Sequence, residues 1–387
     1  MELPTEGATA YQVVLTGFGG FDKLAVSERA VAAHDDELGD SDVRVRVRAC
    51  GMNFADNYVR QGIYVTGNLR PPLVMGMEAA GDVVQVGSDV RRIKVGDRVM
   101  CWSFRYGLWT SLACVPEARC LRLPEQMSYA EGAAFPINYA TAYLAILDFG
   151  GLKKGQKVLV QAAAGGVGWA ATQLCHTVED VTVFGTSSAS KFTLTRRNGV
   201  NHPINYREED FVQKVLQIEP KGVDIVLDSL SGADFTRSRQ LLKPMGRLIH
   251  IGISNMVVGE RFSVWNSLRT WWQTRLVNVY DLNTDCHAVC GFNLALLADV
   301  DPDRVLQVLQ HLLELYGQGK VKPRIDSQWS FGELSGWVHS LTGGSGNGAH
   351  DYQEERWQDN PDPRGCQGKG RGNNKLKRAG KLRITLR

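Results

Sequence analysis

The segment 161–168, Gln-Ala-Ala-Ala-Gly-Gly-Val-Gly, consists mostly of alanine and glycine, and it constrains the fold of this chain more than any other feature. They follow the apolar run Val158–Val160 and precede a segment of good helix formers that begins at Trp169. Glycines let a buried strand turn sharply into a helix that packs closely against it. Two readings remain open: a turn built to bind a phosphate, or a tight strand–helix turn that binds nothing.

The sequence around this turn alternates between strand-like and helix-like segments. Such alternation predicts a doubly wound parallel sheet of the α/β class. The near-continuous apolar character of Val223–Leu227 is typical of a strand covered on both faces. The strand-like runs are Val158–Gln161, Val181–Gly185, Pro203–Tyr206, Val223–Leu230 and Arg247–Ile253.

The first third of the chain is richer in strand formers. Short runs of this kind predict strands at Tyr11–Thr16, Val43–Cys50, Ala80–Val86 and Arg98–Trp102. A helical pattern over Met127–Asp148 then begins at Ser128, a suitable N-cap with Glu131 three residues on.

The region after residue 292 contains one more helix and one more strand signal. Apolar residues recur at helical spacing after Pro302, up to Tyr316. Pro323–Trp329 then reads as a strand.

Composition narrows the function classes. The net charge of +3 is too small to indicate nucleic-acid binding, and the basic excess lies in the tail, where Arg364–Arg387 contains nine Lys or Arg and no acidic residue. The eight cysteines form no CxxC pair, and the start of the chain has no signal-peptide pattern, so we expect a soluble protein of the reducing cytoplasm. The uncharged run Val158–Cys175 contains Gln161 and three glycines, which favours a buried strand–turn–helix over a membrane span.

The turn and the strand after it indicate which nucleotide would bind. Glycine backbone N–H groups and a helix N-terminus suit a diphosphate. An NAD site has an acidic side chain at the end of the next strand, but this strand ends in Gly185–Ser188, followed by Lys191. Hydroxyl groups and an ammonium group would instead donate to a 2′-phosphate, so the sequence favours NADP(H).

Several motifs resemble the medium-chain dehydrogenase/reductase superfamily, and within it the quinone oxidoreductase branch. Besides the glycine turn, they are the segments 53–64 (NFADNYVRQGIY), 76–81 (GMEAAG) and 96–99 (GDRV). The segments 15–20 (LTGFGG), 242–246 (LKPMG), 269–272 (RTWW) and 290–293 (CGFN) are most similar to the group of synaptic vesicle membrane proteins.

The resemblance implies a GroES-like, β-rich catalytic domain and a Rossmann nucleotide-binding domain. The catalytic domain would span 1–136 and resume over 293–342, with the Rossmann domain over 137–292. A Gly-rich and then basic tail over 343–387 departs from the family pattern. We expect this tail to be disordered; the alternative is a late strand near Gly380–Leu386.

The resemblance also implies the residues around the coenzyme. Asn138 and Thr141 would lie by the nicotinamide, and Gly165, Gly166, Val167 and Gly168 would take the diphosphate. The 2′-phosphate and adenine would be met by Ser187, Lys191 and Tyr206. The remaining contacts would come from Gly252, Ser254, Phe292 and Asn293.

The zinc ligands of related dehydrogenases are replaced in this chain. Asn53 stands where those members have a cysteine, and Met77 stands where they have a histidine before Glu78. An amide and a thioether are poor zinc ligands, so the sequence predicts no metal. None of the eight histidines has a metal-binding spacing, and none is assigned a catalytic role.

Without a metal, the substrate oxygen needs hydrogen-bond donors. Tyr58 and Tyr64 are the candidates for donation or for stacking on a flat substrate, although both also fit ordinary packing. Asn53 and Asp56 could orient the nicotinamide side of the cleft, and Asp56 is equally suited to cap a helix.

The resemblance leaves two classes of function open. The first is a zinc-independent oxidoreductase that uses NADPH to reduce quinones or α,β-unsaturated carbonyls. The second is an NADPH-binding regulatory or scaffold protein, peripherally associated with vesicles or the mitochondrial outer membrane. The resemblance also implies a homodimer through the edge strand near Val289–Asn293.

Overall fold

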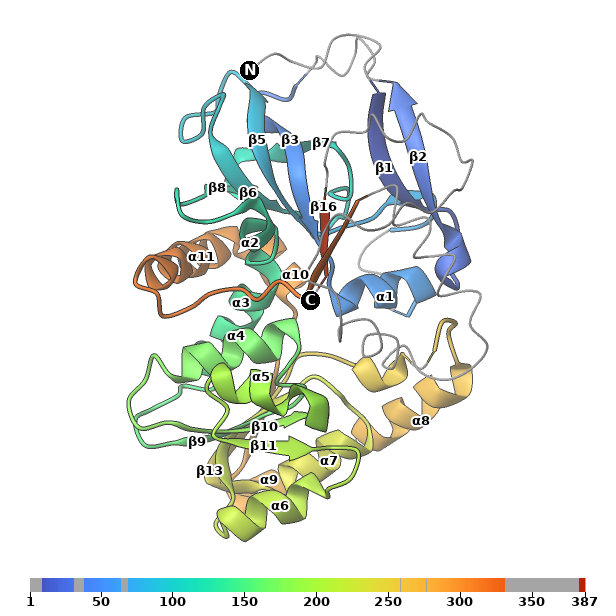
Figure 1. Ribbon diagram of the computed structural model, residues 1–387. Coiled ribbons are helices and arrows are strands. Elements are labelled where there is room, and N and C mark those ends of the chain that lie inside the picture. The colour runs from blue at the N-terminus through green and yellow to red at the C-terminus, as the bar shows by residue number, and fades with distance from the viewer. Residues whose placement is uncertain are drawn as a thin grey trace, which may run out of the picture.

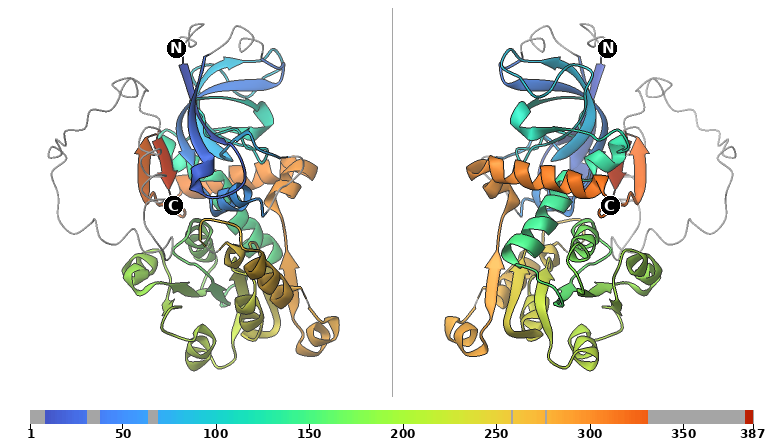
Figure 2. Two further views of the ribbon diagram at one scale, coloured as in Figure 1. Left: turned by 90° about the vertical axis from the view of Figure 1, so that its right-hand side faces the viewer. Right: turned by 90° about the vertical axis from the view of Figure 1, so that its left-hand side faces the viewer.

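The computed structural model describes residues 9–30, 38–63, 69–257, 259–275, 277–330 and the backbone of 383–386. In Figure 1 a β-rich half lies above a second half that contains a parallel sheet, with helices between the two. The side views in Figure 2 show the same division. The chain is therefore a mixed α/β protein with one sheet system in each half.

The lower half contains the predicted parallel sheet. All of its strand pairs are parallel. In spatial order the strands are β11 (His202–Asn205), β10 (Thr182–Ser187), β9 (Lys157–Val160), β12 (Val223–Asp228), β13 (Leu242–His250) and β14 (Ala288–Gly291). The helices after these strands are α4 (Gly166–Cys175), α5 (Phe192–Arg197), α6 (Phe211–Ile218), α7 (Ala233–Arg239), α8 (Val264–Thr274) and α9 (Val279–Asp285).

Both faces of this sheet are covered, as the apolar strands predict. In β9, Val158 and Val160 belong to the large core that includes α4, whereas Leu159 belongs to a second core with Phe211 of α6 and Phe235 of α7. Strand β12 is buried along almost its whole length. It ends at Asp228, before the predicted end, because its carboxylate accepts the backbone N–H groups of the turn that follows.

The upper half is built from an antiparallel sheet and a larger, mostly antiparallel sheet. One has the order β2 (Leu24–Ala30), β1 (Thr9–Leu15) and β4 (Leu73–Val74). The larger sheet contains β3 (Asp42–Gly51), β5 (Glu78–Val86), β6 (Arg98–Trp102), β7 (Leu112–Pro116), β8 (Cys120–Arg122), β15 (Ser327–Ser330) and β16 (Arg383–Leu386). Helix α1 (Phe54–Gln61) follows β3 at the lower edge of this half.

Short helices connect the two halves. The helical pattern after Met127 is confirmed, but it breaks into α2 (Tyr129–Ala133), α3 (Pro136–Tyr143) and a π-helical segment, Leu144–Phe149. Pro136 causes the break, since proline starts a helix readily but cannot continue one. Helices α10 (Leu294–Val300) and α11 (Pro302–Gly317) pack against α3.

The end of the chain differs in part from expectation. Residues Arg383–Leu386 form β16, which is parallel to β3 and antiparallel to β15. These four residues therefore form a late strand, the alternative to the expected disorder. Without β16, Ala49–Gly51 of β3 and the facing edge of β15 would keep unpaired backbone groups, and such strand edges recruit further strands. Residues 331–382 lie outside the described part, and the domain boundaries stay predictions.

Candidate functional site

The glycine turn lies between β9 and α4, as the sequence predicts. Helix α4 begins after Gly165, which has an extended backbone and supplies no side-chain cap. A Cβ at Gly168 would come within 2.4 Å of the Ala162 carbonyl oxygen, so this glycine is needed for packing. A Cβ at Gly165 would meet only the same oxygen, at 3.2 Å, so packing does not require glycine there.

The start of α4 can therefore accept an anion. Its first turn, Gly166-Val167-Gly168, presents backbone N–H groups without a side-chain cap, and a helix N-terminus carries partial positive charge. A pocket lies against this turn. The pocket is lined by Ala134, Tyr139, Ala164, Gly165, Gly166, Trp169, Pro323 and Arg324. A diphosphate fits these donors and this open glycine.

The residues predicted to meet the 2′-phosphate and adenine lie near the ends of β10 and β11. Ser187, the last residue of β10, pairs with Asn205, the last residue of β11, and Tyr206 follows directly after β11. Lys191 lies at the start of α5, and no ion pair joins its ammonium group to a residue of the described chain. Tyr206 is 48% exposed, so its ring is available for stacking.

A chain of polar side chains joins the two halves near the turn. Glu78 is completely buried, and its Oε1 accepts a hydrogen bond from Asn53 Nδ2 at 2.8 Å. Asn53 Oδ1 in turn accepts from Asn138 Nδ2 at 3.0 Å. The Asn138 amide lies over Gly166, where a Cβ would be 2.6 Å from Asn138 Oδ1. The structure thus brings Asn53 and Asn138 together beside the glycine turn.

Asp56 caps its own helix. Its Oδ2 accepts the backbone N–H of Asn53 at 2.7 Å, and its Oδ1 is buried without a partner in the described chain. Burial is the main reason that the pKa of Asp56 is raised to about 8; the Asn53 hydrogen bond acts in the opposite direction, and the charge of Glu78 acts in the same direction as burial.

Tyr58 connects α1 to the loop after β13. Its phenol oxygen accepts the Ile253 backbone N–H at 3.1 Å. Burial raises the pKa of Tyr58, and the negative charge of Asp228 adds to this effect, so the phenol stays protonated at neutral pH. Its own hydrogen is donated to no residue that the structure describes, so it is available for a ligand. Tyr64, the other predicted donor, lies outside the described residues.

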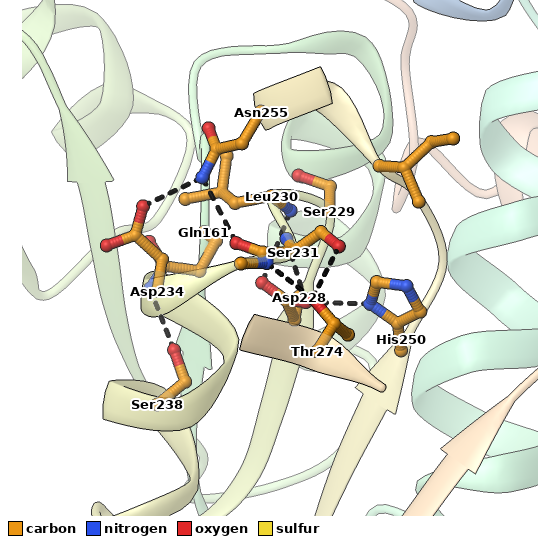
Figure 3. A network of polar contacts seen from close by, with 12 residues as sticks. Gln161, Asp228, Ser229, Leu230, Ser231, Asp234, Ser238, His250, Asn255 and Thr274 are labelled. Atoms are coloured by element: carbon orange, nitrogen blue, oxygen red, sulfur yellow. Dashed lines mark hydrogen bonds and ion pairs between the residues drawn. The ribbon is translucent and has the colours of Figure 1, made fainter. Parts of the chain in front are cut away.

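The loop after β13 is held by a polar network at the carboxyl ends of the strands (Figure 3). Ser254 Oγ donates to the Ser229 carbonyl oxygen at 2.8 Å, and a Cβ at Gly252 would lie 3.4 Å from the Tyr58 hydroxyl. Gly252 and Ser254 therefore both lie beside Ser229, in the turn that follows β12, and the Ser254 hydroxyl is bonded within the protein.

Three other predicted residues have structural partners. The Thr141 hydroxyl donates to the Ile137 carbonyl oxygen, one turn earlier in α3, at 2.7 Å. Asn293 caps α10 by accepting the backbone N–H groups of Ala295 and Leu296. Phe292 stacks on Phe149 with ring centroids 5.2 Å apart.

Sequence reasoning missed a buried acid–histidine pair. Asp228 is fully buried at the end of β12, and its Oδ2 lies 2.8 Å from His250 Nδ1 at the end of β13. Gln161, before the glycine turn, donates to Ser238 and accepts from Thr186. The only sequence signal was a polar residue at the end of each apolar strand.

Comparisons with known proteins support the assignment of the two halves. The model of the alcohol dehydrogenase GroES-like domain matches residues 39–125, and that of a zinc-binding dehydrogenase matches 198–336. The chain is 48% identical over 324 residues to the synaptic vesicle membrane protein VAT-1 homolog of Rattus norvegicus, covering 84% of this chain and 79% of the relative.

Solved structures agree with these matches. The crystal structure of a human VAT-1 homolog-like protein has a TM-score of 0.71 and 35% identity, covering 86% of this chain and 94% of that one. An Escherichia coli quinone oxidoreductase, solved in complex with NADPH, has a TM-score of 0.69 and 26% identity, covering 86% and 95%.

Proposed function

The chain belongs to the quinone oxidoreductase branch of the medium-chain dehydrogenase/reductase superfamily, in the group of synaptic vesicle membrane protein VAT-1 homologues, and from this membership we propose its activity. We propose that it reduces quinones or α,β-unsaturated carbonyls by hydride transfer from NADPH, without zinc. The uncapped start of α4 at an open glycine turn is the observation that carries this proposal.

The residues present fit NADP(H). The backbone of Gly165–Gly168 would bind the diphosphate, and Ser187, Lys191 and Tyr206 would surround the 2′-phosphate and adenine. Asn138, on α3, lies against the start of α4 and bonds to Asn53 of the β-rich half, where the nicotinamide would lie. Further contacts are proposed for Thr141, Gly252, Ser254, Phe292 and Asn293. Bound NADPH would supply the hydride.

The protein's own part in the reaction would be to stabilise charge on the substrate oxygen. Tyr58 keeps its phenolic hydrogen and is positioned by the Ile253 N–H, so it can donate to an oxygen that becomes negative. Tyr64 is retained as a second proposed donor. Asn53 and Asp56 would position groups around this cleft, because Asn53 is bonded to Glu78 and Asn138, and Asp56 holds the Asn53 backbone.

The side chains near Glu78 that could act as metal ligands support zinc-independent chemistry. Asn53 uses its amide nitrogen and oxygen for hydrogen bonds to Glu78 and Asn138. Met77 contributes only a thioether, which is a poor ligand for zinc. Metal analysis of the active protein tests this point, and stoichiometric zinc would contradict it.

Gly165→Asp tests the nucleotide site with little cost to the fold. The backbone of Gly165 suits an Asp N-cap, so the helix should be as stable as before, or slightly more so. Its carboxylate would occupy the N–H groups that the diphosphate needs and repel it. We expect NADPH affinity to fall by roughly a hundredfold or more, since about 2.7 kcal/mol corresponds to that factor.

Gly317→Asp is the matched control. Gly317 is exposed, and an added Cβ there meets no atom within 4 Å. Calorimetric titration with NADPH and NADH should show an unchanged preference for NADPH in this control. Equal affinities for the two coenzymes in the unmodified protein would contradict the NADP(H) assignment.

The second candidate is a scaffold role at a membrane surface, and one surface favours it. Helix α8 exposes Trp265 (84%), Trp272 (62%) and Leu268 (51%), beside the exposed Arg269 and Arg275. Aromatic and apolar side chains flanked by arginines are typical of helices that bind an anionic lipid interface. No helix within the described ranges combines the length and apolar character needed to cross a bilayer.

Turnover separates the two candidate functions. NADPH oxidation measured across a panel of quinones and enones should show substrate-dependent activity if the protein is an oxidoreductase. Tight NADPH binding without turnover on any member of the panel would favour the scaffold role.

A homodimer is also proposed, since β14 is an edge strand of its sheet, and light scattering in solution would test it.

A further inference from the structure

The amide oxygen of Asn138 is an unused acceptor at the start of α4. Asn138 is only 7% exposed, and its nitrogen is bonded to Asn53. Its Oδ1 accepts no hydrogen bond from any residue that the structure describes, and it lies directly over Gly166. This amide oxygen can therefore accept a hydrogen bond, and a ligand with an N–H or O–H group would be favoured there.

The direction of this amide follows from Glu78. A carboxylate can only accept hydrogen bonds, and Glu78 Oε2 already accepts the Ile137 backbone N–H at 3.0 Å. Asn53 must therefore turn its NH₂ group toward Oε1 and its oxygen away. That oxygen can only accept, so Asn138 must turn its own NH₂ group toward it. Asn138 Oδ1 is then left facing the glycine turn.

We propose that Glu78 is a positioning residue which, through Asn53, holds Asn138 Oδ1 as the acceptor for an amide NH₂ group of the bound coenzyme. This inference rests on the proposed function. In NADPH the groups with an NH₂ are adenine and the nicotinamide carboxamide. The adenine is assigned to the β10–β11 edge, whereas Asn138 contacts Asn53 of the β-rich half. The carboxamide is therefore the donor that reaches Asn138.

The test compares NADPH with its reduced 3-acetylpyridine analogue, in which a methyl ketone replaces the carboxamide. The analogue has no N–H donor at this position and is otherwise the same. Calorimetry on the full chain should show that NADPH binds roughly tenfold more tightly, the effect of about one hydrogen bond.

Glu78→Gln should abolish this discrimination. The Ile137 N–H requires the oxygen of the new amide on its side, which leaves the NH₂ group of Gln facing Asn53. The chain of amides then reverses, and Asn138 presents its NH₂ group to the ligand. Both the carboxamide and the ketone have a carbonyl oxygen that accepts from it, so the affinity ratio should approach one. Asn138→Ala should lower the ratio in the same way, because it removes the acceptor.

Two further measurements make each outcome decisive. Glu179→Gln, the same change at an exposed glutamate, should keep the wild-type ratio. The fragment 2′-phospho-ADP-ribose lacks the nicotinamide and should bind wild type and Glu78→Gln equally. Failure of wild type to bind it would reject the proposed function instead.

A wild-type ratio retained in Glu78→Gln or in Asn138→Ala would overturn the inference. Loss of 2′-phospho-ADP-ribose binding in Glu78→Gln would also overturn it, since Glu78 would then support the whole fold and not the direction of one amide.

Discussion

At the scale of single residues, the site depends on a few polar groups in a mostly apolar junction. Glu78 and Asp56 are both buried, and two amides lead from Glu78 to the glycine turn. A buried polar group is costly unless it has partners, and Asp56 Oδ1 lacks one within the described chain, which favours the protonated carboxyl group. Asn138 Oδ1 also accepts no hydrogen bond from a described residue, and it is left for a ligand.

Asp56 predicts a pH dependence of stability. Its pKa is raised from 3.8 to about 8 in the folded protein, so the folded state holds this proton more tightly than the unfolded chain does. The stabilising contribution is therefore complete below pH 3.8 and is lost as pH rises toward 8. Asp56→Asn removes this loss, and its stability relative to wild type should rise by about 1 kcal/mol per pH unit.

Urea unfolding of wild type and Asp56→Asn at pH 5, 6 and 7 measures this difference. The matched control is Asp89→Asn, in which the replaced side chain is 64% exposed, and its difference from wild type should stay constant with pH. A constant difference for Asp56→Asn as well would show that Asp56 ionises normally in the folded protein.

At the scale of elements, α1 holds the β-rich half against the loop after β13. Arg60 is 2% exposed and donates to the Gly19 carbonyl oxygen and, at 2.7 Å, to that of Glu260. Gln61 donates to the Gly259 carbonyl oxygen at 3.0 Å. Together with the Tyr58–Ile253 hydrogen bond, these contacts make the face of α1 an interface between the halves.

Removing Arg60 should weaken this interface strongly. Arg60→Leu leaves two carbonyl groups without their donor, and we expect it to lower the free energy of unfolding by about 2–4 kcal/mol. Arg197→Leu, at an exposed position at the end of α5, should change it by less than about 0.5 kcal/mol. Denaturant unfolding compares the two variants, and similar small effects would mean that α1 does not hold the loop.

At the scale of the whole molecule, helix α8 lies at the outer edge of the lower half (Figure 1). It exposes Trp265, Trp271 and Trp272. Arg275 lies over the Trp272 ring, 3.7 Å from its centroid, and over Trp271 at 4.8 Å. This cationic and aromatic surface is separate from the glycine turn, so membrane binding and coenzyme binding can be tested independently.

The double variant Trp265→Ser/Trp272→Ser should lose membrane binding and keep NADPH affinity. Each large apolar side chain contributes about 1.5–3 kcal/mol when buried, so we expect cosedimentation with anionic phospholipid vesicles to weaken roughly tenfold or more. Leu216→Ser on α6, which is 36% exposed, is the control and should bind vesicles as wild type does. Failure of wild type to bind vesicles would count against the scaffold role.

The sequence by itself determined the parallel sheet, the glycine turn and the family, because strand periodicity, glycine spacing and motif order are local properties. It also placed the Ser128 cap and the start of the helix at Pro302. It could not show that Asn53, Glu78 and Asn138 form one chain of hydrogen bonds, because Glu78 lies 25 positions and Asn138 lies 85 positions from Asn53 in the sequence.

Tertiary structure alone decided the roles of the polar residues. Asp228 and His250 meet only because β12 and β13 are neighbours in the sheet. Residues 383–386 join β3 although more than 300 positions separate them, because an unpaired strand edge accepts any chain with compatible register. Burial and partnership, which set the proton affinity of Asp56 and the direction of the Asn138 amide, arise when distant segments pack together.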